Sequence, residues 1–176
     1  MQAQKIVLTV CKGNIHRSVI AAASITKLLE ERSLGGSIAV RSRGLQGAFG
    51  FAPPRRPSIR DYPEEWALTQ PGIESLGIVI PDDQTATPIT INDVAEAHLI
   101  LAMDAMVRDA VLEGFRDEMP LLSEKTMLFM ELGGVSEDVP DLDGKRSLKL
   151  FDRVTEVIYR TAEANFSTLV RLVSSA

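Results

Sequence analysis

The sequence predicts an α/β fold: a single domain over residues 1–176, with a four-stranded parallel sheet and helices on both faces. Two observations support this prediction. Apolar, β-branched runs typical of buried strands alternate with segments that repeat apolar residues at helical spacing, as in parallel-sheet proteins. The chain also has 176 residues, 45% of them hydrophobic, which is enough for one domain with a core and few for two.

The first predicted elements are a strand, a helix and a second strand. Lys5–Val10 is a continuous apolar run, and Val19–Glu31 repeats apolar residues along one helical face. Ser37–Ser42 alternates in polarity, as a half-buried strand does. A helix between two strands is the connection that a parallel pair needs.

The second half of the chain continues this alternation. His98–Met103 predicts a third strand, and Asp104 is placed to cap the helix that follows it. Met127–Leu132 is predicted to be the fourth strand. From about Ser147 to Val173 the apolar residues share one helical face, so we expect one long C-terminal helix.

A segment without periodicity separates the second and third strands. Residues 44–63 are rich in Gly, Pro and Arg, and we expect a loop there. Loops of this length are uncommon in compact domains, where they serve as lids and binding loops or are disordered. The arginines Arg55, Arg56 and Arg60 are either solvated or available to an anionic substrate.

Composition and charge exclude several classes of function. The formal net charge is -5 and the pI is about 5.1, which disfavours general binding of nucleic acid or of an anionic membrane. No segment approaches the roughly 18 apolar residues of a membrane span, and the N-terminus lacks a signal-peptide pattern, so we expect a cytoplasmic protein. One cysteine and two histidines form no disulfide and no credible zinc site.

Cys11–Ser18 is the most informative string in the sequence. It runs from a cysteine through five residues to an arginine and a hydroxyl residue, between a predicted strand and a predicted helix. Backbone N–H groups in such a turn form a concave nest, and the positive end of the helix points into it. The string therefore predicts a phosphate-binding loop between the first strand and the first helix. Its five inner residues are Lys12, Gly13, Asn14, Ile15 and His16.

The side chains at the ends of this string are expected to carry the chemistry. The helix N-terminus and Arg17 favour the nucleophilic thiolate form of Cys11. The planar fork of Arg17 suits two phosphoryl oxygens, and Ser18 is placed to donate a hydrogen bond to the sulfur. A cysteine at a strand end is also commonly a small buried hydrophobe, but packing alone does not explain Arg17 and Ser18 beside it.

Val10–Ser18 resembles the signature of the low-molecular-weight protein tyrosine phosphatases. Leu99–Asp104 is similar to the family's third strand and the start of its next helix, and Val139–Asp141 is similar to its late acidic loop. The resemblance implies a hydrolase that dephosphorylates phosphotyrosine in proteins or peptides without a metal or organic cofactor.

The resemblance also implies roles for single residues. Cys11 would carry a phosphocysteine intermediate, and Asp141 would be the general acid that protonates the leaving group. Asp141 lies in an acidic cluster that by itself is typical of a solvated loop, and Asp138 and Asp143 are the alternative acids.

Several positions depart from the family pattern. His16 stands where a second cysteine is common, so a protective disulfide cannot form. Leu142 and Asp143 stand where a proline and an aromatic residue usually follow the acid, so one aromatic wall of the substrate site is missing. Gln84 and Thr87 stand where a histidine and an arginine support the loop asparagine, so we expect that support to be weaker.

The entrance of the site departs as well. Phe49 and Phe51 lie where the family offers an aromatic residue at the entrance, and we expect them either to line the substrate site or to pack in the core. The Pro- and Arg-rich loop 45–71 is longer than the family's and is a candidate extension of the substrate groove. Ile15 is similar to members that act on phosphotyrosine rather than phosphoarginine.

Three other functions stay open from the sequence. A phosphate- or phosphoprotein-binding module with weak or no turnover would keep the loop but position Asp141 or His16 poorly. A protein-arginine phosphatase would share the loop. An arsenate reductase shares the fold and the loop but passes electrons through additional cysteines, and this chain has only one.

Overall fold

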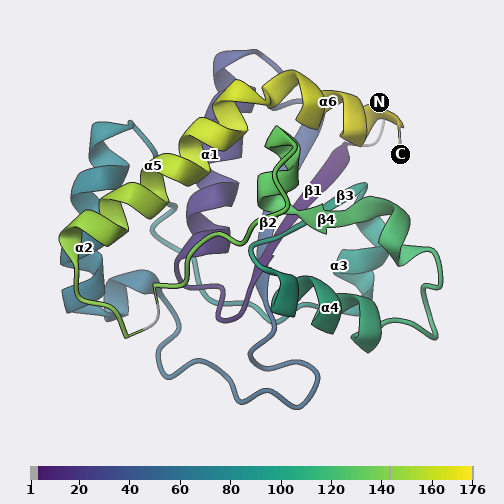
Figure 1. Cartoon of the computed structure of the whole chain (residues 1–176), viewed down its shortest axis with the longest axis horizontal. Helices are drawn as coiled ribbons and strands as arrows, with labels where there is room; N and C mark the ends of the chain where they lie inside the picture. Colours follow the sequence, from purple (N-terminus) through teal and green to yellow (C-terminus); the bar gives the residue numbers. More distant parts are fainter. Residues whose placement is uncertain (1–3, 143, 176) are drawn as a thin grey trace.

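The computed structural model of the protein describes residues 4–142 and 144–175 (Figure 1). Its centre is a sheet of four parallel strands in the order β2-β1-β3-β4. The strands are β1 (Lys5–Cys11), β2 (Ile38–Gly44), β3 (Leu99–Ala102) and β4 (Thr126–Leu128). Val7 of β1 pairs with Val40 of β2 and with Leu99 of β3. The predicted fold class is confirmed.

Helices cover both faces of this sheet (Figure 1). They are α1 (Arg17–Glu31), α2 (Pro63–Ser75), α3 (Ile91–Glu96), α4 (Ala105–Gly114), α5 (Leu148–Ala164) and α6 (Phe166–Ser175), with short 3-10 turns η1 (Ile59–Asp61), η2 (Leu122–Lys125) and η3 (Phe129–Gly133). Side chains alternate along a strand, so Val7 of β1 packs with α1 and α5 on one face, while Leu8 packs with α3 and α4 on the other. No helix of the described residues is long and apolar enough to span a bilayer.

The strand order determines where a ligand can bind. β1 lies between β2 and β3, so the chain leaves β1 toward one edge of the sheet and later returns to its other side. In open α/β sheets such a reversal leaves a crevice at the carboxyl ends of the strands, and ligands bind there. Cys11 is the last residue of β1 and lies at that position.

The fourth strand is shorter than the sequence predicted. Met127–Leu132 was expected to be one strand, but β4 ends at Leu128 and η3 follows it. The Glu131 carboxylate accepts the N–H of Leu128 at 2.8 Å, which turns the chain out of the sheet. Phe129 and Leu132 are both buried, because a spacing of three residues places them on one side of a 3-10 turn.

The prediction of one long C-terminal helix is also wrong. The chain forms α5 and α6, separated at Asn165. The Asn165 side chain donates to the Thr161 carbonyl at 2.9 Å, and Leu169 N–H donates to the Asn165 carbonyl at 3.0 Å. The apolar pattern continues across this junction because both helices pack on the same core, α5 against α1 and α6 against β1.

The predicted loop 45–71 is irregular only in its first part. η1 begins at Ile59 and α2 begins at Pro63, so residues 63–71 are helical. Proline at the first helical position followed by Glu64 and Glu65 is a favourable helix start, since the missing N–H is unpaired there and the carboxylates complement the helix dipole. Pro71 lies inside α2. Because proline usually breaks a helix, the sequence did not predict a helix here.

Phe151 of α5 is predicted to be a stability determinant. It is fully buried and its ring packs edge-on against His16, with 5.8 Å between centroids. We expect Phe151→Ala to lower the free energy of unfolding by about 3–5 kcal/mol, as measured by urea denaturation, because it leaves a cavity. Leu148→Ala on the same helix, at a position 47% exposed, is the control and should change it by less than about 0.5 kcal/mol. Equal effects of the two changes would contradict the assigned packing.

Candidate active site

The phosphate-binding loop is held against the end of β2. Leu45 N–H donates to the Cys11 carbonyl at 3.2 Å, and Gln46 N–H donates to the Lys12 carbonyl at 2.9 Å. At Gly44 a Cβ atom would lie 2.8 Å from the Asn14 nitrogen, which is closer than real Cβ contacts allow. The loop therefore depends on glycine at the end of the neighbouring strand.

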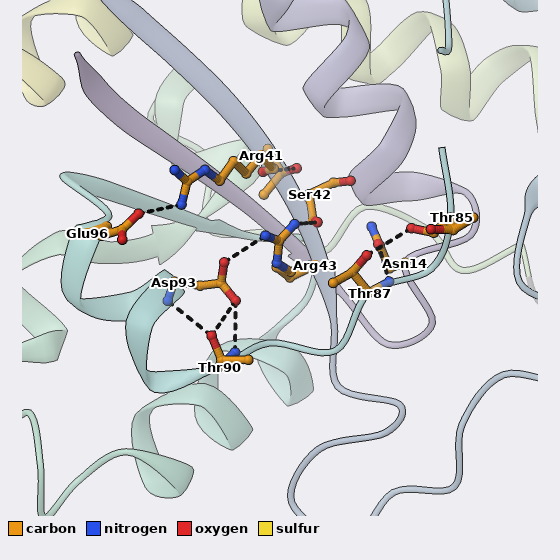
Figure 2. Close-up of polar contacts among 10 residues, drawn as sticks. Asn14, Arg41, Ser42, Arg43, Thr85, Thr87, Thr90, Asp93 and Glu96 are labelled. Carbon is orange, nitrogen blue, oxygen red and sulfur yellow. Dashed lines mark hydrogen bonds and ion pairs between the residues drawn. The ribbon is translucent and has the colours of Figure 1, made fainter. Parts of the chain in front are cut away.

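Asn14 fixes the shape of the loop. Its φ of 54° lies in the left-handed region, where asparagine is one of the few side chains tolerated. The buried side chain donates from Nδ2 to Ser18 Oγ at 3.1 Å. Its Oδ1 accepts the N–H of Thr87 at 2.9 Å (Figure 2). Thr87 therefore supports Asn14 with its backbone N–H, while the Gln84 side chain donates to the Thr85 carbonyl instead of to Asn14.

Two groups approach the Cys11 sulfur. Ser18 Oγ lies 3.0 Å from Sγ, and Asn14 N–H donates to Sγ at 3.2 Å. Because Ser18 Oγ already accepts a hydrogen bond from Asn14 Nδ2, its own hydrogen is available to the sulfur. Hydrogen bonds to a buried sulfur stabilise negative charge on it.

The N-terminus of α1 is open toward the loop. The side chain of His16, at the N-cap position, makes no capping hydrogen bond. Its ring packs edge-on against Phe151. The first N–H groups of α1 therefore point toward the loop, where they favour an anion.

Arg17 is buried and contacts three oxygens. Its Nη1 donates to Asp104 Oδ2 at 2.7 Å and to the Val139 carbonyl at 3.0 Å, and its Nη2 lies 3.2 Å from Asp141 Oδ1. Asp104 Oδ1 also accepts the N–H of Val107 at 2.8 Å, as the sequence predicted for a helix cap. The Arg17–Asp104 contact was missed, since local spacing carries no signal for residues 87 positions apart.

The late acidic loop is attached to the end of β3. Val139 N–H donates to the Met103 carbonyl at 2.8 Å, and the Val139 and Leu142 side chains are buried. Between them the Asp141 side chain is 54% exposed and faces Arg17. The buried neighbours therefore hold the carboxylate at the rim of the loop.

The two alternative acids do not share this position. Asp138 Oδ1 accepts the N–H of Ala105 at 2.8 Å, so its carboxylate lies at the start of α4. Asp143 lies outside the described residues.

A cavity of about 720 Å³ opens at the loop. Its lining includes seven of the predicted site residues, namely Cys11, Lys12, Gly13, Ile15, His16, Arg17 and Asp141. Two further predicted residues, Asn14 and Ser18, are buried and contact the sulfur from within the protein. The structure thus brings the predicted loop and the predicted acid together.

Phe49 and Phe51 do not line this cavity. Phe49 packs edge-on against Phe115 at the end of α4, with 4.9 Å between ring centroids. Gly114 leaves room for this ring, since a Cβ there would overlap it. The structure therefore does not place Phe49 and Phe51 as substrate-lining residues. Phe49 packs against Phe115, and Phe51 lies outside the cavity.

An aromatic wall of the cavity is formed by Tyr62, which the sequence pattern did not single out. Tyr62 precedes Pro63 at the start of α2, and both line the cavity with Arg55 and Arg56. The Tyr62 hydroxyl accepts the N–H of Arg56 at 3.0 Å, and the Arg56 guanidinium lies 5.7 Å from the ring centroid. The helix-start signal at Pro63 would have placed this tyrosine just before α2, but it carries no information about the cavity.

The described residues contain no group of three or more His, Cys, Asp or Glu side chains that could hold a metal ion. The positive charge in the described part of the cavity comes instead from arginine and lysine side chains and from the N-terminus of α1.

Known proteins match the chain in sequence pattern and in fold. The family model described as low molecular weight phosphotyrosine protein phosphatase matches residues 6–174. A low molecular weight phosphotyrosine phosphatase from Vibrio cholerae O395 is 25% identical, with a TM-score of 0.75 over 94% of this chain and 96% of that chain. YwlE arginine phosphatase from Geobacillus stearothermophilus is 20% identical, with a TM-score of 0.71 over 98% of this chain and 97% of that chain. No curated protein sequence matches the chain.

Gly44 provides a test of the loop geometry. We expect Gly44→Ala to weaken binding of vanadate, a phosphate analogue, by at least about tenfold in calorimetric titration, because the new methyl group displaces the loop. Gly36→Ala is the matched control, since no atom beyond its two chain neighbours lies within 4 Å of its Cβ position. Unchanged vanadate binding in Gly44→Ala would show that the loop accommodates the methyl group.

Proposed function

The chain belongs to the low molecular weight phosphotyrosine protein phosphatase family, and we propose that it hydrolyses phosphotyrosine in proteins through a phosphocysteine intermediate. The observation that carries the proposal is the meeting of Cys11, Arg17 and Asp141 at one cavity. A nucleophile, a phosphoryl clamp and an acid are the three groups that this chemistry requires.

In the first step the Cys11 thiolate attacks phosphorus. The S–P bond forms as the P–O bond to the leaving group breaks, and Asp141 donates its proton to the leaving oxygen. The first N–H groups of α1 and the Arg17 guanidinium hold the equatorial oxygens. In the free protein Arg17 Nη2 contacts Asp141. When substrate binds, this Nη2 group donates to phosphoryl oxygens instead, and the Asp141 carboxyl group becomes available to the leaving oxygen.

In the second step water attacks the phosphocysteine. The Asp141 carboxylate accepts a proton from the water, the P–S bond breaks and inorganic phosphate forms. The electron pair returns to the sulfur, where the Ser18 hydroxyl and the Asn14 N–H stabilise the thiolate as it leaves.

Tyr62 supports phosphotyrosine as the substrate. Its ring lines the same cavity as Cys11, and the apolar Ile15 also belongs to the lining. An aromatic wall suits a phenyl leaving group, because aromatic pairs contribute about 0.5–1.5 kcal/mol beyond their buried area. Tyr62 thus supplies the aromatic surface that Leu142 does not.

Phosphoarginine is the second candidate substrate. Glu64 and Glu65 line the cavity, and carboxylates pair well with a guanidinium group. Glu64 is already paired with Arg146, another residue of the lining, which leaves Glu65 as the carboxylate for such a substrate. YwlE arginine phosphatase has a similar fold, so phosphoarginine and phosphotyrosine peptides should be compared directly as substrates.

Substitution of the nucleophile and the acid tests the mechanism. We expect Cys11→Ser to abolish hydrolysis of an aryl phosphate between pH 5 and 8 with EDTA present. Asp141→Asn should lower kcat by about 10²–10⁴ because the leaving group loses its proton donor. Rapid quenching of Asp141→Asn should trap a phosphocysteine, detected by mass spectrometry.

Asp138→Asn is the control for the acid and should keep kcat within about threefold, since Asp138 binds the start of α4. A wild-type protein that binds vanadate tightly without turnover would instead indicate a phosphate-binding module.

The substrate preference is tested at Tyr62. We expect Tyr62→Leu to lower kcat/KM for a phosphotyrosine peptide by about tenfold, mainly through KM, because the aromatic contact is lost. Tyr62→Phe keeps the ring and should stay within about threefold. A phosphoarginine peptide is measured in parallel, and a higher kcat/KM for that peptide in the wild type would reverse the assignment.

A further inference from the structure

The segment between α2 and α3 supports the phosphate-binding loop although it has no regular structure. Residues 81–90 contain no helix or paired strand beyond one isolated bridge at Pro88. This segment nevertheless supplies the N–H group that Asn14 Oδ1 accepts (Figure 2). Its position therefore has to be fixed by contacts outside the segment.

Part of that fixation comes from the end of β2. Gly44 N–H donates to the Thr87 carbonyl at 3.0 Å, and Ile89 N–H donates to the Gly44 carbonyl at 2.9 Å. The same Gly44 lies against the backbone of Asn14 on its other side. Thr87 and Asn14 are thus held in register by a single residue of β2.

Other contacts hold the rest of the segment. Ala86 N–H donates to the Pro57 carbonyl, and Arg60 binds the Pro81 carbonyl and Asp82.

Arg43 and Asp93 hold the end that leads into α3. Arg43 Nη2 lies 2.8 Å from Asp93 Oδ1, and only 7% of the Asp93 side chain is exposed. Asp93 Oδ2 accepts the N–H of Thr90 at 3.0 Å and its hydroxyl at 2.7 Å. Figure 2 shows that this one carboxylate ties the end of the segment to β2, one residue before Gly44.

Asp93 stays charged in this arrangement. Burial acts to raise the pKa of Asp93, but the hydrogen bonds from Arg43 and Thr90 outweigh it and hold this pKa below its usual value. The contact between Arg43 and Asp93 is therefore a charged pair at neutral pH.

A second arginine pair on β2 gives a natural comparison. Arg41, two residues earlier, donates from Nη1 to Glu96 Oε2 at 2.6 Å (Figure 2). Both of these side chains are solvated, with exposures of 38% and 53%. The Arg41 pair reaches the end of α3 rather than Thr90, so it does not hold the segment that carries Thr87.

We propose that Arg43 and Asp93 are positioning residues that act on the Cys11 sulfur through Thr90, Thr87 and Asn14. The pair holds Thr87 against Asn14, which keeps Asn14 in its left-handed conformation. Asn14 in turn orients Ser18, whose hydroxyl contacts the sulfur. Arg43 and Asp93 touch neither the substrate cavity nor the reacting atoms.

The first test is amide hydrogen exchange, which does not require the proposed phosphatase activity. We expect the Thr87 amide to exchange at least tenfold faster in Arg43→Met and in Asp93→Asn than in the wild type. Buried amides of β1 should keep their rates. Arg41→Met is the matched control and should leave the Thr87 amide unchanged. A uniform increase at all amides would show a general loss of stability and would overturn the proposal.

The second test is kinetic and rests on the proposed function. With an aryl phosphate, Arg43→Met should lower kcat about tenfold and leave KM within threefold, because Arg17 and the N-terminus of α1 still hold the phosphate. Arg43→Lys keeps a positive charge toward Asp93 and should recover most of that loss. Equal kcat values for Arg43→Met and Arg41→Met would overturn the positioning role.

The same variants still test the positioning role if Arg43→Met fails to fold or if the wild type shows no turnover. If Arg43→Met does not fold, the comparison of Arg43→Lys and Asp93→Asn with Arg41→Met decides the positioning role in its place. If the wild type shows no turnover, the proposed function fails, while the exchange rate of Thr87 still decides whether Arg43 and Asp93 hold the loop support.

Discussion

The buried guanidinium of Arg17 is the interaction on which the site depends. A charge inside a protein is costly unless it is paired and hydrogen-bonded, so the fold has to bring acceptors to it. Asp104 comes from the end of β3, and Val139 and Asp141 come from the late loop. The same contacts that satisfy Arg17 therefore assemble the phosphate-binding loop, the cap of α4 and the candidate acid around one point.

The strand order makes this assembly possible. With β1 between β2 and β3, each neighbour approaches the loop after Cys11 from a different side. β3 delivers the partners of Arg17, and β2 delivers Gly44, which lies against Asn14. A cysteine at an edge strand would have only one such neighbour.

The conformation of Asn14 connects stability to function. A left-handed residue other than glycine costs of order 1 kcal/mol or more and persists only where its surroundings determine it. Here Ser18, Thr87 and the close approach of Gly44 do so. This conformation places the Asn14 N–H and, through Ser18, a hydroxyl at the sulfur, where the proposed mechanism requires negative charge before attack and after release.

Local sequence by itself determined the alternation of strands and helices, the loop from Cys11 to Arg17 and the cap at Asp104. These features depend on residues a few positions apart, whose side-chain types and spacing carry the signal. The apolar pattern hid two local features, the end of β4 at Leu128 and the break at Asn165, because buried side chains continue across both. Tertiary structure alone decided that Tyr62 rather than Phe49 lines the cavity. It also decided the pairing of Arg17 with Asp104 and of Arg43 with Asp93, because strand order and register determine which distant side chains meet, and local spacing does not encode them.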